Sequence, residues 1–288
     1  MTDGVQTPTT EPVDNHCYRH PDRETYVRCQ RCGRPICGQC QTLAPVGVHC
    51  PECVREARGS SGSRPIGVRM GRAMSSGSGR PVITISIIAV CAIVFILECL
   101  TGLSPLTGGG RSVVENVLAY YPHAILTAPW SVITVNFVHA NILHIASNMV
   151  SLFFVGVPLE RYLGRARFAA VFFISGIGAV VGVDFFANEE VVGASGAIFG
   201  ILGALLVFNR RIGISLQQLV FLVVFNLAIS FAVPGIAWQA HIGGLIVGAA
   251  LGLLLLRTSA IRRRVAQIVG FVGVTIVLLA ALLLNALA

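Results

Sequence analysis

A chain of 288 residues with 54% hydrophobic residues, 12% charged residues and a mean hydropathy of +0.76 is too apolar to be a soluble globular protein. Its formal net charge of +8 comes from arginine alone, because the sequence contains no lysine. Since most of the chain has the composition of membrane sequence, we interpret this charge as a determinant of membrane topology and not as a nucleic-acid-binding surface.

Four pairs of potential metal ligands follow a polar segment at 1–15, which we expect to be disordered. Each pair has two intervening residues, and the pairs are Cys17/His20, Cys29/Cys32, Cys37/Cys40 and Cys50/Cys53. Disulfides are disfavoured in a cytoplasmic segment, so the pairs favour zinc, and eight ligands imply two tetrahedral ions. We therefore predict a structural zinc module over residues 16–54 that depends on its metals to fold.

A linker and seven apolar segments make up the rest of the chain. Residues 55–81 are rich in Gly, Ser and Arg, which is typical of a flexible linker. Each apolar segment has about the length of a membrane-spanning helix, which predicts an all-α polytopic membrane protein. The segments lie at about 82–100, 140–158, 167–183, 195–209, 214–233, 237–256 and 265–287.

Arginines in alternate connectors predict the orientation in the membrane. They follow the second, fourth and sixth segments, at Arg161, Arg165, Arg167, Arg210, Arg211, Arg257, Arg262, Arg263 and Arg264. The positive-inside rule then predicts a cytoplasmic N-terminus and an extracytoplasmic C-terminus. We expect a multi-pass protein of a bacterial plasma membrane.

Four polar side chains from three apolar segments fall at a similar depth. His144 and Asn148 share one face of the second segment, Ser195 opens the fourth, and His241 lies in the sixth. Counted back from the cytoplasmic arginines, all four lie about 20–26 Å along their helices, displaced toward the outer face. Each alone has an ordinary explanation, such as an N-cap for the serine. Polar groups within spans are costly, however, so the shared depth favours a functional site.

Small residues give the fourth and sixth segments a means of close approach. The spacings Gly196-x3-Gly200 and Gly244-x3-Gly248 allow helix backbones to touch. A seryl oxygen and an imidazole brought within hydrogen-bond reach form a nucleophile and its base.

The acidic residues near the outer face do not complete a catalytic triad in this interpretation. We expect Asp184, Glu189 and Glu190 to be solvated loop residues. Tyr120, in the long outer loop at 101–139, is expected to be an interfacial aromatic residue.

Residues 82–260 resemble a rhomboid, an intramembrane serine protease. The resemblance rests on Gly193-x-Ser195-Gly196, His139-Ala-Asn-Ile-Leu-His144-x3-Asn148 and Ala240-His241-x2-Gly244-x3-Gly248. It implies a six-helix core, to which residues 261–288 add one C-terminal transmembrane helix. The family's Trp-Arg pair in the first outer loop is replaced here by Trp130-Ser131, which bears on loop stability more than on catalysis.

The resemblance also implies a role for each polar residue. Ser195 and His241 would form a catalytic dyad without an acid, and His144 and Asn148 would bind the oxyanion. Phe199, one turn after the serine, would pack against the catalytic histidine. The implied substrates are single-span membrane proteins, cut near the outer end of a helix, with no cofactor for catalysis.

The N-terminal module resembles a B-box-type zinc finger, in which alternate ligand pairs share an ion. On that basis Cys17, His20, Cys37 and Cys40 hold one zinc ion, and Cys29, Cys32, Cys50 and Cys53 hold the other. A tandem ribbon arrangement fits the same spacings. We expect the module to dock a cytosolic protein partner or a substrate tail.

Two other functions fit parts of the sequence. A non-catalytic membrane adaptor would bind client helices and use the finger to recruit a partner. A small-solute transporter would place its polar groups near the midplane and contain inverted repeats, and the sequence has neither feature. We expect the serine endopeptidase, with lipid and protein partners and no nucleic acid.

Overall fold

The computed structural model describes residues 15–44, 47–59, 79–107, 109–187, 189–258 and 263–288. The chain divides into two compact units, Met1–Pro65 and Ile66–Ala288. Almost all of the predicted tail at 1–15, and most of the predicted linker at 55–81, lie outside the described residues.

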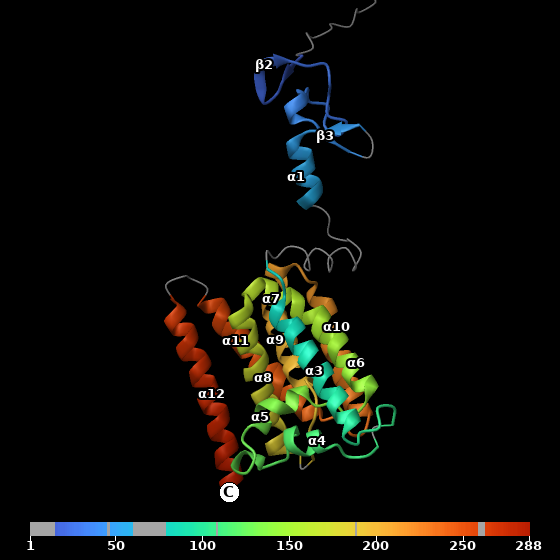
Figure 1. Cartoon of the computed structure of the whole chain (residues 1–288). Coiled ribbons are helices and arrows are strands. Elements are labelled where there is room, and N and C mark those ends of the chain that lie inside the picture. The colour runs from blue at the N-terminus through green and yellow to red at the C-terminus, as the bar shows by residue number, and fades with distance from the viewer. Residues whose placement is uncertain (1–14, 45–46, 60–78, 108, 188, 259–262) are drawn as a thin grey trace, which may run out of the picture. The chain divides into compact units, whose positions relative to one another are not determined.

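The N-terminal unit is built from short elements. Strands β1 (His16–Cys17) and β2 (His20–Glu24) pair antiparallel, as do β3 (Thr42–Leu43) and β4 (Val48–His49), and α1 (Pro51–Gly59) follows (Figure 1). Its buried cluster consists of Ile36 and six cysteines. A core with so little apolar volume cannot account for the stability of the fold, so other bonds must hold this unit together.

The second unit is a bundle of long apolar helices (Figure 1). Its long elements are α3 (Val82–Leu100), α6 (Ile142–Ser151) continuing into α7 (Val157–Leu163), α8 (Arg165–Phe186), α9 (Ser195–Ile212), α10 (Leu216–Ala232), α11 (Trp238–Arg257) and α12 (Arg264–Leu287). Within the described residues, six helices are long and apolar enough to cross a membrane. The predicted fifth segment, 214–233, forms α10, which is apolar but has only 17 residues. The predicted all-α polytopic fold is confirmed.

The second span is longer than the sequence predicted. We expected a segment over 140–158, whereas the helix runs from Ile142 to Leu163. Its middle, Leu152–Gly156, is π-helical. An inserted π-turn rotates the residues that follow it relative to a regular helix, and such turns occur often at functional sites.

Helices α8, α9 and α11 pack most extensively against one another. A Cβ added at Gly244 would overlap the carbonyl oxygen of Gly196, and one added at Gly248 would overlap that of Gly200. The predicted close approach of the two glycine-spaced helices is therefore confirmed. Backbone contact of this kind leaves little freedom for α9 to shift against α11.

Asp184 and Glu190 are not solvated loop residues, so the expectation for them was wrong. Asp184 is 4% exposed and accepts hydrogen bonds from Tyr120 Oη (2.6 Å), the backbone N–H of His123 (2.8 Å) and Asn285 Nδ2 (2.9 Å). Glu190 accepts from the Tyr121 hydroxyl at 2.6 Å and pairs with Arg111. A buried carboxyl is retained where several donors compensate its desolvation.

The loop between α3 and α6, which we expect to be an outer interfacial loop, contains helices of its own. It contains α4 (Val113–Leu118) and α5 (Ser131–Thr134). Tyr120 is fully buried, contrary to expectation, and burial together with its bond to Asp184 raises the pKa of its hydroxyl. Ser131 is buried too, and its hydroxyl donates to the carbonyl of Ala128 at 2.6 Å. Ser131 thus supports the start of α5 by a local hydrogen bond.

Candidate functional site

The serine of the glycine motif is the first residue of α9. Gly193 precedes it with a φ of +116°, which an L side chain rarely adopts, and its N–H donates to the carbonyl of Val135 at 3.0 Å. Ala194 is the N-cap residue. The first backbone N–H groups of a helix lack intrahelical acceptors, so unpaired donors lie next to the Ser195 side chain.

Ser195 and His241 lie within hydrogen-bond distance. Ser195 Oγ is 2.9 Å from His241 Nε2, although the residues are 46 positions apart and belong to α9 and α11. The imidazole stacks on the ring of Phe199, with centroids 4.2 Å apart and planes inclined by 10°. His241 is 6% exposed, so the ring is held against α9 and largely away from solvent.

A second serine contacts the other nitrogen of the same imidazole. Ser230 Oγ, on α10, lies 2.7 Å from His241 Nδ1. The Ser230 hydroxyl also donates to the carbonyl of Asn226 at 2.7 Å. Ser230 is not assigned to the site from the sequence, although Asn226 and Ser230 are polar residues four positions apart on one face of an apolar segment, as His144 and Asn148 are.

His144 lies against the turn before Ser195, and both His144 and Asn148 have local hydrogen bonds. The backbone N–H of His144 donates to Asn141 Oδ1 at 2.9 Å, which caps α6. A Cβ added at Gly193 would lie 2.7 Å from His144 Nε2, so the imidazole packs directly against the turn before Ser195. Asn148 is 5% exposed, and its Nδ2 donates to the carbonyl of His144 at 2.9 Å.

Glu98 and His139, which the sequence does not assign to the site, extend the polar cluster. Glu98 is fully buried on α3 and accepts from the backbone N–H of His139, at 3.2 Å for Oε2. The His139 ring contacts that of His144 edge-on, with centroids 5.2 Å apart. Burial, followed by the neighbouring His144, lowers the pKa of His139 to about 3. His139 is therefore a neutral packing partner of His144 at physiological pH.

The eight predicted metal ligands of the N-terminal unit form two groups. The first group consists of Cys17, His20, Cys37 and Cys40, and the second of Cys29, Cys32, Cys50 and Cys53. Within each group, one ligand atom of each residue lies within 4.8 Å of those of the other three. These are the groups that a B-box-type pairing requires. A tandem ribbon would instead join the first pair to the second, so the observed grouping disagrees with it.

The spacing of the donor atoms fits a tetrahedral ion. His20 Nδ1 lies 3.4 Å from the Sγ atoms of Cys37 and Cys40 and 3.8 Å from that of Cys17. Tetrahedral zinc, about 2.3 Å from sulfur and about 2.05 Å from nitrogen, separates sulfur from nitrogen by about 3.5 Å and two sulfurs by about 3.8 Å. In the second group, Cys32 Sγ and Cys50 Sγ are 3.7 Å apart.

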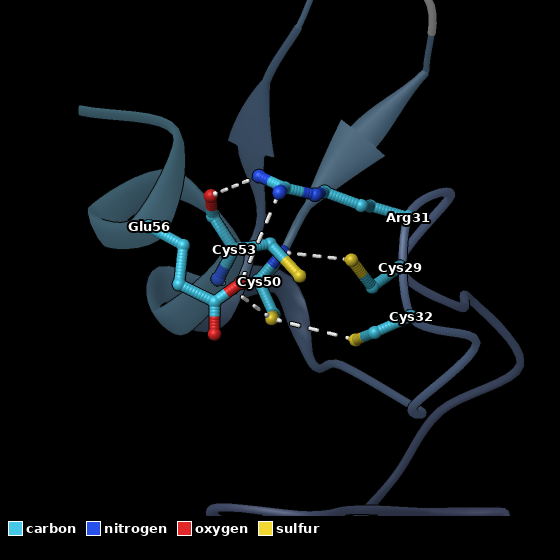
Figure 2. A network of polar contacts seen from close by, with 6 residues as sticks. All are labelled: Cys29, Arg31, Cys32, Cys50, Cys53 and Glu56. Carbon is cyan, nitrogen blue, oxygen red and sulfur yellow. Dashed lines mark hydrogen bonds and ion pairs between the residues drawn. The ribbon is translucent and has the colours of Figure 1, made fainter. Parts of the chain in front are cut away.

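Polar contacts brace the second group (Figure 2). Cys50 donates its backbone N–H to Cys29 Sγ at 3.2 Å, and Arg31 reaches the carbonyl of Cys53 at 3.0 Å and approaches Glu56 at 3.9 Å. Burial, followed by the neighbouring thiols, raises the pKa of Cys53 to about 12. Four thiols so close together cannot all ionise unless a cation compensates their charge, so the donor set suits a metal ion.

These features define a class of protein: a polytopic all-α membrane protein with a serine and a histidine paired inside its helix bundle. Residues 127–258 match the family model of the rhomboid domain. That match and the named relatives below support the rhomboid family for this chain.

Three relatives illustrate the similarity. The chain is 34% identical over 136 residues to RHOMBOID-like protein 4 of Arabidopsis thaliana, covering 44% of this chain and 34% of that protein. It is 33% identical over 192 residues to Rhomboid protease GluP of Bacillus subtilis (strain 168), covering 61% and 36%. It is 35% identical over 139 residues to Rhomboid-type serine protease 2 of Emericella nidulans, covering 45% and 27%.

The relatives support a multi-pass membrane protein of a protease-containing family. The chain spans 34%, 36% and 27% of the lengths of these three proteins. They come from a plant, a bacterium and a fungus, so they do not support the bacterial origin, or the orientation, that the sequence analysis predicted.

Proposed function

We propose that this chain is an intramembrane serine endopeptidase that cuts transmembrane helices of membrane proteins. The observation that carries the proposal is the 2.9 Å approach of Ser195 Oγ to His241 Nε2, with the imidazole stacked on Phe199. A nucleophile with its base at this distance, in a site built from several helices, is arranged for acyl transfer. The names of two relatives, which include the words protease and serine protease, agree with this class of reaction.

In the first half of the reaction, Ser195 Oγ attacks the scissile carbonyl carbon while its proton passes to His241 Nε2. The resulting imidazolium then gives that proton to the leaving amine as the C–N bond breaks, and an acyl-enzyme remains. In the second half, water loses a proton to His241 and attacks the ester, which releases the new carboxyl end and restores the serine hydroxyl.

Donors around Ser195 would stabilise the negative oxygen of each tetrahedral intermediate. We assign this role to His144, to Asn148 and to the free backbone N–H groups at the start of α9. His144 packs against the turn before Ser195, and the N-terminus of a helix favours negative charge. The Asn148 amide, which bonds to its own helix, would have to rotate toward the intermediate.

The expected substrates are single-span membrane proteins. A peptide bond inside a helix is shielded, so the substrate must unwind locally before Ser195 can reach it. Because the paired residues belong to apolar helices, a segment that enters from the lipid fits the site better than a soluble peptide does. We assign the N-terminus to the cytoplasm and the C-terminus to the opposite side, in line with the arginine pattern.

The N-terminal unit is proposed to hold two structural zinc ions, one in each group of four ligands. Sulfur and imidazole donors in sets of four, with the spacings described above, suit this ion. Zinc would supply the cross-links that the small apolar core lacks. We propose that the folded finger then binds a cytosolic protein partner or a substrate tail.

The test is cleavage of a single-span reporter by purified protein in liposomes. Ser195→Ala and His241→Ala should each lower the cleavage rate by at least about 10³-fold, since nucleophile and base act as one unit. Thr275→Ala, which removes a hydroxyl on α12, is the matched control and should cleave normally. Wild-type rates in either site variant would overturn the proposal.

A non-catalytic adaptor makes the opposite prediction. It would capture the reporter helix equally well in wild type and in Ser195→Ala, with no cleavage by either. Some relatives carry only the name RHOMBOID-like, so this outcome is measured in the same experiment by co-purification of intact reporter.

A further inference from the structure

We propose that Ser230 is a positioning residue that fixes the tautomer and the rotation of His241. The inference rests on the proposed function, because it concerns the base of the Ser195 reaction. It goes beyond a two-residue dyad by adding a third group, from α10, that acts through the histidine.

The contact is short and buried. Ser230 Oγ lies 2.7 Å from His241 Nδ1, and Ser230 is 3% exposed. Among the described residues of α10, only Leu219, Val223 and Ser230 are buried. The one polar member of this set therefore points at the imidazole, and burial of its hydroxyl without partners would be costly.

Proton counting decides which tautomer the contact favours. The Ser230 hydroxyl has one hydrogen, which it donates to the carbonyl of Asn226 at 2.7 Å. Toward His241 it can therefore only accept, so Nδ1 must carry the proton. Nε2 is then left with its lone pair, which is the form that can take a proton from Ser195 Oγ.

The opposite tautomer is disfavoured on both sides of the ring. With the proton on Nε2, His241 would donate to Ser195 and could not act as its base. Ser230 would have to give up its bond to Asn226 to donate to Nδ1. Losing a buried hydrogen bond is unfavourable, so the local network selects the reactive form.

Phe199 and Ser230 constrain different motions of the imidazole. Stacking on Phe199 fixes the plane of the ring but permits rotation within that plane. The bond to Ser230 removes this rotation and directs Nε2 toward Ser195. When Nε2 gains the proton, Nδ1–H already has an acceptor, so no reorganisation accompanies the step. Ser230 keeps its own proton throughout.

Paired variants at position 230 separate the hydroxyl from its volume. Ser230→Thr keeps the hydroxyl, whereas Ser230→Val introduces a side chain of nearly the same shape as threonine that has no hydroxyl. We expect Val and Ala variants to lower kcat on the order of 10- to 100-fold with KM within about twofold, and Thr to restore most of the rate. Thr275→Ala, which removes a hydroxyl with the same i−4 bond from α12, is the control.

The outcomes distinguish the inference from the proposed function. If wild type cleaves, Ser195→Ala does not, and Ser230→Ala keeps a kcat within twofold of wild type, then the inference fails and the dyad stands. Equal rates for Thr and Val, or a change in KM alone, would also overturn it, because a structural role predicts those results. If the Ser230→Val protein does not accumulate, the kcat of Ser230→Ala relative to wild type tests the inference.

Discussion

The turn before Ser195 requires a glycine at position 193, both for its backbone conformation and for the space that a side chain would fill. Its φ of +116° disfavours any L side chain, and an added Cβ would lie 2.7 Å from His144 Nε2. We predict that Gly193→Ala lowers the initial cleavage rate by at least about 10-fold, since a displacement of about 1 Å in an active site is enough for such a loss.

Gly273→Ala is the matched control for Gly193→Ala. Gly273 is a helical glycine on α12, and an added Cβ would meet nothing within 4 Å. The control should cleave normally and be stabilised slightly, because alanine favours helix more than glycine does. Equal rates for the two alanine variants would show that the turn before Ser195 tolerates a side chain.

At the scale of single residues, the position of a side chain along a helix is easier to predict from the sequence than the side of the helix on which it lies. The distances of Ser195 and His241 from the flanking arginines predict that the two residues lie at one level, because helix rise is constant. Ser230 is not identified in this way, because the side that α10 turns toward α11 depends on packing. Asp184 was misassigned because its partners Tyr120 and Asn285 lie far from it in sequence.

At the scale of the elements, hydrogen bonds near both ends of α12 connect it to the rest of the bundle. Near its start, Gln267 accepts from Arg167 at 3.0 Å and donates to the carbonyl of Thr258 at 2.7 Å. Near its end, Asn285 Nδ2 donates to Asp184 Oδ2 at 2.9 Å. Most of the helix is not buried against the bundle, since only 11% of its most apolar 18-residue stretch is buried.

We predict that Asn285→Leu destabilises the helix bundle by about 1–3 kcal/mol, because it removes a donor from a buried carboxyl. The measurement is the thermal unfolding midpoint in detergent. Leu284→Ala, at an adjacent position that is 70% exposed, is the control and should unfold like wild type. An unchanged midpoint for Asn285→Leu would mean that α12 does not depend on this bond.

The glycine spacings were the most reliable signal for how elements pack. They identified α9 and α11 as touching helices because only glycine allows the carbonyl oxygens of one backbone to approach the other so closely. The π-helical segment at Leu152–Gly156 had no comparable signal, so the second span was predicted too short.

At the scale of the whole molecule, we expect the N-terminal unit to depend on metal ions for its stability. The finger should hold two zinc ions per chain, measured by elemental mass spectrometry. Cys50→Ser should lower this to about one ion and increase hydrogen exchange in the finger, because metal binding supplies its folding free energy. Cys99→Ser, in α3, should keep both ions. Zinc content unaffected by Cys50→Ser would contradict the assignment.

Composition and the length of the apolar segments predict the all-α polytopic fold, because the membrane restricts spanning segments to apolar helices of limited length. The ligand spacing predicts the four ligand pairs but leaves their grouping open, and the observed grouping is the one that the resemblance to a B-box-type finger implies. The partner of the finger has no such signal, since an exposed binding surface leaves no periodic pattern in the sequence.

The reactivity of Ser195 is central to the proposed mechanism, and a fluorophosphonate probe measures it directly. After labelling in liposomes, peptide mass mapping should place the phosphonyl group on Ser195 of the wild-type protein, and His241→Ala should lose the adduct while remaining folded. A folded wild-type protein that cleaves its reporter without an adduct on Ser195, or an equal adduct yield in His241→Ala, would contradict the proposed dyad.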